Sequence, residues 1–349
     1  MKKIFIAAGG TGGHINAALS MGNEFSKNYE VIYLTGTRYL DYQLLKNEKV
    51  IHLNSAPLRS KNPFKILVSL FMNSLIFFKI LGLYIKEKPR FIIGAGGYVC
   101  GPTLMAAKAL FKPIFIIEQN AIMGVTNKIL SKFANIIFVN FKNTKGINSS
   151  DNRVKCVGNP IRASIKSTPN IFKEKLKILV FGGSLGATQI NTVIQKIVKR
   201  DSLEVEIIHQ VGKNNIQPDI TQTKKIKYEQ LEYIDDMAEK YNWANLIIAR
   251  AGASTISELR VVKRPSLLIP FPHATDNHQY YNAVELKDEN NFYVNVIDHQ
   301  LNSDDLVEVL EKEILEIITN KEKYLISKDM NLNNTSLIIK EEIEKYVWS

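Results

Sequence analysis

The stretch IFIAAGGTGGHINAALS, residues 4–20, contains the pattern that decides the fold of the N-terminal half. An apolar run leads into five residues with four glycines, and His14 follows at the expected start of a helix. Glycines let a ligand approach the backbone at such a turn, and the helix start offers unpaired N–H groups. The stretch predicts a strand, a turn and a helix that together bind an anion or a polar substrate. Glycines that only make a tight turn would give the same pattern.

The layout of lysine, apolar strand and glycine-rich turn occurs again at KILVFGGSLGA, residues 177–187. Between and beyond these turns, short apolar runs alternate with helical patterns, which is typical of doubly wound parallel sheets. The predicted strands are Lys3–Ala8, Val31–Thr35, Phe91–Ile93, Ile114–Ile117, Ile136–Val139, Lys177–Phe181, Glu204–Gln210, Leu246–Ala249 and Ser266–Ile269. We therefore expect an α/β chain with two domains, residues 1–160 and 161–349, and a last helix free to pack back on the first domain.

Composition narrows the function classes. The 349 residues are 45% hydrophobic and include two cysteines, Cys100 and Cys156, which are too few for a disulfide framework and indicate a reducing, cytosolic setting. The net charge of +11 predicts an anionic partner, either nucleic acid, a phosphorylated substrate or a membrane surface. No aromatic-and-basic stripe or known module supports nucleic-acid binding, so we expect none.

Two familiar nucleotide sites do not fit. A dinucleotide fingerprint counted from Gly10 would end at Ile15 rather than glycine, and we expect no acid after the second strand, VIYLTGTR. Neither glycine turn has the Gly-Lys-Ser/Thr ending of a P-loop. The chain has no Asp-x-Asp pair, and the spacing of His273 and His278 matches no strong metal motif. We expect no metal and no cofactor.

Four further stretches gather polar groups at predicted strand ends: GAGGYVCGP (94–102), EQNAIMG (118–124), ARAGASTISE (249–258) and PFPHATDNHQYYNA (270–283). In the third, Thr255 and Glu258 fit a helix capping box. The alternative is that backbone N–H groups near Ala253 hold phosphate while the Glu258 carboxylate accepts from ribose hydroxyls. In the fourth, residues 276–279 are either ordinary helix capping or donors and acceptors for sugar hydroxyls.

The ordered series GGTGGH, GGYVCGP, EQN, GNPIR, GGSLGA, EYIDDM, RAGASTISE and HQYYNA resembles the motifs of the MurG family, the UDP-N-acetylglucosamine transferases of peptidoglycan synthesis. The resemblance covers nearly the whole chain. It implies the GT-B fold, in which two Rossmann-like doubly wound domains face across a cleft. It also implies metal-independent, inverting transfer of N-acetylglucosamine from UDP to the 4-hydroxyl of the muramoyl sugar of lipid I. Lipid II would form at the cytoplasmic face of the cell membrane, where other cell-wall synthesis proteins are further candidate partners.

The resemblance also assigns site residues by motif. His14 would be the catalytic base, and the groups facing the donor sugar would be Thr11, Gly12, Gly13 and Asn120. In the same way, Arg162 and Ser184 would lie near the nucleotide or its phosphates, and Tyr233 and Ile234 would cover the uracil by stacking and backbone contact. The phosphate and ribose segment would be Ala253, Ser254, Thr255, Ile256, Ser257 and Glu258, with Gln279 on the sugar hydroxyls.

The chain departs from the family at two motif positions. Ala17 replaces a proline after the histidine, which a helix start tolerates. Leu185 replaces the glutamine of GGSQGA, which puts any contact of that side chain in doubt. A UDP-sugar epimerase with the same fold is the alternative function, and it would need no lipid acceptor.

The segment FKILVSLFMNSLIFFKILGLYI, residues 64–85, is long and apolar enough to raise the question of a transmembrane helix. Lys65 and Lys79 oppose a crossing, and a crossing would put strands of one sheet on opposite sides. We expect a helix partly buried in the domain and partly docked on an anionic membrane, helped by Arg59, Lys61, Lys86, Lys88 and Arg90. A wholly buried core helix is the alternative.

Overall fold

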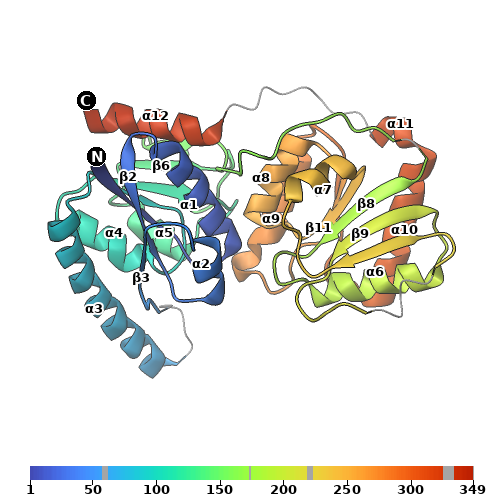
Figure 1. The fold of residues 1–349 in the computed structure, drawn as a ribbon, viewed down its shortest axis with the longest axis horizontal. Helices are drawn as coiled ribbons and strands as arrows, with labels where there is room; N and C mark the ends of the chain where they lie inside the picture. Colours follow the sequence, from blue (N-terminus) through green and yellow to red (C-terminus); the bar gives the residue numbers. More distant parts are fainter. Residues whose placement is uncertain (57–61, 173, 218–222, 325–333, 349) are drawn as a thin grey trace. The chain divides into compact units, whose positions relative to one another are not determined.

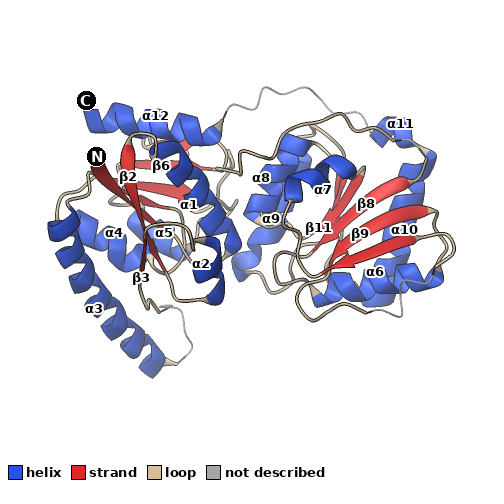
Figure 2. Ribbon diagram, in the orientation of Figure 1, coloured by secondary structure: helices blue, strands red, loops and turns tan. Residues whose placement is uncertain are grey.

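The computed structural model describes residues 1–56, 62–172, 174–217, 223–324 and 334–348. The chain forms two compact α/β units (Figure 1). The first unit holds Met1–Arg162 together with the C-terminal helix α12 (Thr335–Trp348), and the second runs from Ala163 through helix α11 (Lys321–Tyr324). In each unit, helices cover both faces of one parallel sheet (Figure 2).

The sheet of the first unit has the order β3-β2-β1-β4-β5-β6-β7, with every pair parallel. Its strands are β1 (Lys2–Ala7), β2 (Tyr29–Thr35), β3 (Val50–His52), β4 (Ile92–Gly94), β5 (Ile114–Glu118), β6 (Ile136–Val139) and β7 (Val154–Cys156). Its helices are α1 (Gly12–Phe25), α2 (Tyr39–Leu44), α3 (Pro63–Glu87), α4 (Cys100–Ala109) and α5 (Val125–Leu130), besides α12. The strand order reverses between β1 and β4, which is where such sheets bind ligands.

Each face of this sheet has its own apolar core. Ile4 and Ile6 of β1 point to the face covered by α1 and α12, whereas Phe5 and Ala7 point to the face covered by α3 and α4. Burial on both faces explains the nearly continuous apolar strands of the sequence. The C-terminal helix belongs to this core because Ile339 is fully buried in it.

Helix α3 is only half embedded in the first unit. Ile76, Ile80 and Tyr84 are buried against the sheet, while Phe71 and Phe78 are 63% and 67% exposed. These exposures contradict the wholly buried alternative. Residues Leu67–Glu87 are long and apolar enough to span a bilayer, with a mean hydropathy of 1.8. A crossing by α3 would nevertheless separate β3 from β4, which belong to one sheet. Arg59, Lys61 and the side chain of Lys65 lie outside the described residues.

The sheet of the second unit has the order β10-β9-β8-β11-β12-β13, again with every pair parallel. Its strands are β8 (Leu176–Phe181), β9 (Val205–Gln210), β10 (Lys227–Leu231), β11 (Leu246–Ala249), β12 (Ser266–Leu268) and β13 (Val294–Val296). Its helices are α6 (Thr188–Arg200), α7 (Met237–Trp243), α8 (Ala253–Val262), the short 3₁₀ helix η2 (Thr275–Asn277), α9 (His278–Asp288), α10 (Ser303–Thr319) and α11. Two parallel, doubly wound α/β units confirm the predicted fold class.

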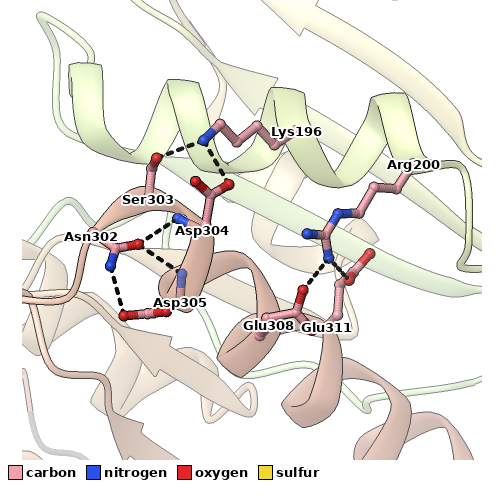
Figure 3. A network of polar contacts seen from close by, with 8 residues as sticks. All are labelled: Lys196, Arg200, Asn302, Ser303, Asp304, Asp305, Glu308 and Glu311. Carbon is pink, nitrogen blue, oxygen red and sulfur yellow. Dashed lines mark hydrogen bonds and ion pairs between the residues drawn. The ribbon is translucent and has the colours of Figure 1, made fainter.

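Helix α6, which follows the second glycine turn, is held from outside by α10 (Figure 3). The Lys196 ammonium donates to Ser303 Oγ at 2.7 Å and to Asp304 Oδ1 at 2.9 Å. One turn further on, the Arg200 guanidinium contacts the carboxylates of Glu308 and Glu311 at 2.7 and 2.8 Å. Asp304 and Glu308 are solvent-exposed, so water and salt screen their ion pairs, and the buried apolar residues between the two helices supply most of the stability.

Candidate active site

The glycine turn after β1 carries His14 at the start of α1. Thr11 is the N-cap residue, and its side-chain oxygen accepts from the His14 backbone N–H at 3.4 Å. The His14 ring folds back on the turn, with Nδ1 3.2 Å from the carbonyl oxygen of Gly9. A carbonyl oxygen can only accept, so in the neutral ring Nδ1 carries the proton and Nε2 the lone pair. The turn therefore sets both the orientation and the tautomer of the predicted base.

The loop after β4, which contains GAGGYVCGP, packs directly on this turn. The Gly9 N–H donates to the Gly96 carbonyl oxygen at 3.2 Å. Gly96 has a φ of +110°, and a Cβ atom added to it would lie 2.6 Å from the His14 ring. Glycine is therefore required here for two reasons, the backbone conformation and the space that the imidazole occupies. The sequence did not indicate that the two glycine stretches meet around His14.

Asp41 and Arg38, just beyond β2, hold the turn from its other side. The buried Asp41 carboxylate accepts from the Gly10 N–H at 3.0 Å and from the Arg38 N–H at 2.9 Å. The Arg38 guanidinium donates to the Gly10 carbonyl oxygen at 2.9 Å. An acidic residue thus does follow the second strand, but its carboxylate binds backbone of the turn. The sequence does not indicate that either residue belongs to the site.

The EQN segment after β5 is ordered by Glu118. This carboxylate is 3% exposed and accepts from the backbone N–H groups of Asn120 and Gly124, each at 3.0 Å. It also accepts from the side chain of Asn127 at 2.9 Å. Gln119 ties the segment to the loop after β4 by donating to the Ala95 carbonyl oxygen at 3.0 Å. The predicted sugar-binding Asn120 therefore belongs to the same interlocked group of strand ends as His14.

Arg162, predicted to approach the donor phosphates, is half-buried at the end of the first unit. The preceding residue, Ile161, is tied to α1 because the Ser20 hydroxyl donates to its carbonyl oxygen at 2.7 Å. Ser336 of α12 lies 2.8 Å from the same hydroxyl. The C-terminal helix and α1 thus fix the chain immediately before Arg162.

In the second unit, Gln210 at the end of β9 joins the two loops predicted to hold the nucleotide. Its amide nitrogen donates to the Gly183 carbonyl oxygen at 2.8 Å, and its amide oxygen accepts from the Ile234 N–H at 2.9 Å. Ser184 and Leu185 are exposed on the glycine turn. The Leu185 side chain, which replaces the family's glutamine, is 83% exposed and supplies no polar group there.

The predicted uracil contacts, Tyr233 and Ile234, differ in what they present. The Tyr233 side chain is 48% exposed, so its ring face is accessible for stacking. Ile234 is buried, and its N–H is already bonded to Gln210. A backbone contact of Ile234 with a base would therefore use its carbonyl oxygen.

The segment after β11 is not the capping box that its sequence allowed. The N-cap residue of α8 is Gly252, no side chain caps this described helix start, and Thr255 already lies in the first turn. The N–H groups of Ala253 and Ser254 face the end of the helix, where an anion is favoured. Ile256 and Ser257 are buried, and the Ser257 hydroxyl donates to the Ala253 carbonyl oxygen.

Glu258 is buried within α8, with 6% of its surface exposed. Its Oε2 atom accepts from the hydroxyl of the fully buried Tyr241 at 2.8 Å. The carboxylate is therefore held in one orientation by a neighbour on α7, a partner that the sequence did not indicate. Holding an acceptor group in place suits it to bind a ligand hydroxyl.

Arg250 and Gln279 hold the loop that follows β12. The Arg250 guanidinium donates to the carbonyl oxygens of Ile269 and Pro270 at 3.0 and 2.8 Å, and burial lowers its pKa to about 10. Gln279, in the first turn of α9, accepts from the Phe271 N–H at 3.0 Å through Oε1. The predicted sugar contact of Gln279 would therefore be made by its amide nitrogen.

Among the described residues, neither His273 nor His278 belongs to a metal cluster. Over the described ranges, no group of three or more His, Cys, Asp or Glu side chains could hold a metal ion. The His278 Nδ1 atom instead donates to the Thr275 carbonyl oxygen at 2.8 Å, within the turn that precedes α9.

Comparison with known proteins gives this arrangement a class. Residues 4–139 match the glycosyltransferase family 28 N-terminal domain, and residues 177–342 match the glycosyltransferase family 28 C-terminal domain. Both units of the fold therefore match a family 28 glycosyltransferase, and the chain belongs to that family.

Similar proteins show to which group within this family the chain belongs. A UDP-N-acetylglucosamine–N-acetylmuramyl-(pentapeptide) pyrophosphoryl-undecaprenol N-acetylglucosamine transferase of Myxococcus xanthus is 35% identical over 82% of this chain and 78% of its own. The corresponding transferase of Vesicomyosocius okutanii is 34% identical over 95% and 94%. The crystal structure of Acinetobacter baumannii MurG covers 99% of this chain and 100% of its own, with 27% identity and a TM-score of 0.73. The chain belongs to this MurG family of transferases.

The fold is shared more widely than the family. The UDP-GlcNAc 2-epimerase of Neisseria meningitidis, solved with UDP-GlcNAc, covers 99% of this chain with a TM-score of 0.66 and 14% identity. At that identity the likeness establishes a common fold alone.

Proposed function

We propose that this chain transfers N-acetylglucosamine from UDP-N-acetylglucosamine to the 4-hydroxyl of the muramoyl sugar of lipid I, forming lipid II with inversion at the transferred carbon. Relatives that match 82% and 95% of this chain carry names for this transfer. The observation that carries the mechanism is the imidazole of His14, held by the glycine turn after β1 with Nδ1 on Gly9.

In the proposed reaction, His14 Nε2 takes the proton of the acceptor hydroxyl as its oxygen bonds to the sugar carbon of the donor. The bond from that carbon to the UDP oxygen breaks at the same time, and UDP leaves with the electron pair. A neutral histidine has the basicity for this step near pH 7. The glycines around it remove side chains that would obstruct a bulky acceptor.

The departing diphosphate gains negative charge, which this chain would balance with backbone N–H groups and cations. The uncapped start of α8 at Ala253 and Ser254 offers both free helix-end donors and the positive end of a helix dipole. Ser184 on the exposed glycine turn and Arg162 would add a hydroxyl and a guanidinium. The ribose hydroxyls would donate to Glu258, with the uracil against Tyr233, so donor recognition rests mainly on the second unit.

The experiment is an assay of the purified chain with UDP-N-acetylglucosamine and a lipid I analogue. We expect a disaccharide-bearing product that forms only when both substrates are present. An epimerase would instead convert UDP-N-acetylglucosamine to its epimer without any acceptor. That product pattern, with no disaccharide, would overturn the proposed transfer.

We also propose that the chain works as a peripheral protein on the cytoplasmic face of the cell membrane, which its lipid-linked acceptor requires. The exposed apolar ridge of α3, defined as Phe64, Leu67, Phe71, Leu75 and Phe78, supports this placement. These residues recur every three or four positions and so lie on one face of the helix. Phe111, 91% exposed after α4, and Lys108 on α4 add to the same kind of surface. Anionic lipid would attract the basic residues at and after the end of α3, namely Lys86, Lys88 and Arg90.

A further inference from the structure

Four side chains at the carboxyl ends of β2 and β3 form a row beside the first glycine turn, namely Arg38, Tyr39, Tyr42 and His52. The row is tied to the turn through Gly36, because a Cβ added to Gly9 would be 3.1 Å from the Gly36 backbone nitrogen. His52, the last residue of β3, lies with its Nδ1 atom 2.8 Å from the Gly36 carbonyl oxygen. Neighbouring strands are about 4.8 Å apart, so His52 lies roughly 10 Å along the sheet edge from β1.

Helix α2 contributes an exposed aromatic surface to this row. The Tyr42 ring stacks on the His52 ring, with the centroids 3.9 Å apart and 21° between the planes. Tyr42 is 48% exposed, so the ring surface that His52 does not cover is accessible. Tyr39, three positions earlier and thus a neighbour of Tyr42 on the helix, is 71% exposed. Helix α2 lies beside the start of α1 (Figure 1), where a Cβ added to Gly12 would be 3.7 Å from Leu40.

Arg38 supplies a positive charge between the glycine turn and this aromatic surface. Its exposed guanidinium uses one N–H group on the Gly10 carbonyl oxygen, and it forms no ion pair with the described residues. Its other N–H groups can therefore bind an anion of a ligand. A guanidinium pairs best with a planar carboxylate, through two parallel hydrogen bonds. The buried Asp41 carboxylate accepts from the Arg38 backbone N–H, which fixes the main chain from which the side chain extends.

The chemistry of the proposed acceptor indicates which of its groups would reach the row. A muramoyl sugar carries its peptide through a lactyl ether on O3, directly beside the 4-hydroxyl that is proposed to react. The diphosphate is attached at C1, on the opposite side of the sugar ring. A 4-hydroxyl held at His14 therefore brings the beginning of the peptide to the glycine turn. An extended peptide advances about 3.4 Å per residue, so roughly three residues would reach from the turn to His52.

From these observations we infer that the row binds the peptide of the acceptor, with Arg38 contacting a peptide carboxylate and the Tyr42 ring packing on the peptide chain. The inference rests on the proposed function. Aromatic rings offer large, flat apolar surfaces on which peptide planes and aliphatic side chains pack. A diphosphate would satisfy Arg38 but would leave the aromatic surface without a contact, whereas an anionic peptide uses both. The row thus recognises the group next to the reacting hydroxyl.

The test measures transfer by the full chain to two lipid I analogues. One carries the peptide, and the other carries only a simple amide on the lactyl group. We expect Arg38→Ala to raise KM for the peptide-bearing acceptor about tenfold or more, the scale of a charged hydrogen bond. KM for the peptide-free acceptor and the affinity for UDP should stay near the parent values. Lys46→Ala, which removes an exposed cation beyond the other end of α2, is the matched control and should behave like the parent with both acceptors.

The aromatic surface is tested separately, with Tyr42→Ala and Tyr42→Phe. Alanine removes the ring, so KM should rise several-fold for the peptide-bearing acceptor alone. Phenylalanine keeps the ring and should restore the parent value. A peptide-bearing acceptor whose carboxylates are converted to amides should bind the parent as weakly as the unmodified acceptor binds Arg38→Ala. The Arg38 side chain is exposed and its backbone bond to Asp41 remains in the alanine variant, so this variant should fold.

Three results would overturn the inference. Equal rises in KM for both acceptors in Arg38→Ala would place the diphosphate, rather than the peptide, on Arg38. Equal falls in kcat with both acceptors, at unchanged KM, would mean that Arg38 only supports the glycine turn. A parent that has the same KM for both acceptors would show that the row binds no peptide. Failure of the proposed function looks different, because the parent chain would then make no disaccharide from either acceptor.

Discussion

His14 donates its Nδ1 proton to the carbonyl oxygen of Gly9, 3.2 Å away, within the turn that leads into its own helix. The same carbonyl lies next to Gly97, because a Cβ on Gly97 would come within 2.3 Å of it. One backbone group therefore orients the imidazole and contacts the loop after β4. The geometry that prepares His14 is made by backbone groups from two strand ends.

Replacing His14 by alanine should lower turnover by roughly 10²- to 10⁴-fold, the usual range for a general base. UDP affinity should survive, since the proposed nucleotide contacts lie mainly in the second unit. Turnover and UDP affinity are measured on the same variant. Near-normal turnover, or affinity lost in proportion to turnover, would mean that His14 is not the base.

Asp41→Asn should impair catalysis indirectly, because Asp41 holds the glycine turn rather than contacting the substrate. The amide of an asparagine would point an N–H group at one of the two backbone N–H donors that the carboxylate now binds, Gly10 and Arg38. Losing charged hydrogen bonds of this kind costs about 1.5 to 3 kcal/mol of stability. We expect turnover to fall by about tenfold while UDP affinity is kept, because the turn that orients His14 loosens.

Asp151→Asn is the matched control for that experiment. Like Asp41, Asp151 accepts from a backbone N–H, that of Arg153, with which it also forms an ion pair, but it lies at a turn before β7, far along the sheet from the glycine turn. It should lower stability modestly and leave turnover unchanged. If both variants lose turnover equally, general destabilisation rather than the glycine turn is the cause.

The interior of both sheets was predictable from sequence, and their edges were not. All nine predicted strands are present, within one or two residues of their predicted bounds. The strands not predicted are β3, β7, β10 and β13, which are the outermost strands of the two sheets. An interior strand is buried on both faces and so reads as an apolar run. An edge strand such as KYEQL at Lys227–Leu231 is partly exposed, so its sequence resembles a loop.

Within the site, the sequence offered predictions for the groups that face a ligand, but it did not indicate the groups that hold them in place. Glycine turns, the EQN segment and RAGASTISE have local patterns that a single chain displays. Asp41 and Gln210 act across sheet neighbours, and such contacts depend on strand order rather than on spacing in the chain. For Thr255 and Glu258 the local pattern left two alternatives open, and the capping box is not formed because the N-cap of α8 is Gly252, three residues before Thr255.

Glu258→Gln should weaken UDP binding by about 1.5 to 3 kcal/mol, the scale of a charged hydrogen bond, if the carboxylate accepts from ribose. Tyr241→Phe is the control, because it removes only the hydroxyl that donates to Glu258 at 2.8 Å. Calorimetric titration with UDP and thermal unfolding are run on both. If both variants lose the same amount of thermal stability and both keep the parent's UDP affinity, then Glu258 has a structural role only.

His209 should make stability fall at acidic pH. Its side chain is fully buried in β9, its Nδ1 lies 2.9 Å from the Tyr228 hydroxyl, and burial lowers its pKa to about 3. In the unfolded chain its pKa returns to about 6.5, so the unfolded state binds the proton first. The contribution of neutral His209 to the free energy of unfolding is then fully present above pH 6.5. It decreases as the pH falls towards 3, by at most about 1.4 kcal/mol per pH unit.

The check is urea unfolding of the parent and His209→Gln between pH 4 and 8. Glutamine keeps a hydrogen-bonding group for Tyr228 but does not titrate in this range. We expect the variant to show a shallower loss of stability below pH 6.5. Parallel curves would assign the acid sensitivity to other groups.

The apolar ridge of α3 should determine membrane binding. Phe71 and Phe78 are 63% and 67% exposed, so serine at either position removes apolar surface without opening the core. Burying such a side chain in lipid contributes about 1.5 to 3 kcal/mol, so each substitution should reduce binding to anionic vesicles by roughly tenfold or more.

Ile171→Ser, which removes an apolar side chain 65% exposed in the second unit, is the control and should bind like the parent. Sedimentation with vesicles measures the bound fraction, and high salt or alkaline carbonate should release the parent. A parent that resists both treatments, or a control that loses as much binding as the ridge variants, would contradict peripheral docking through α3.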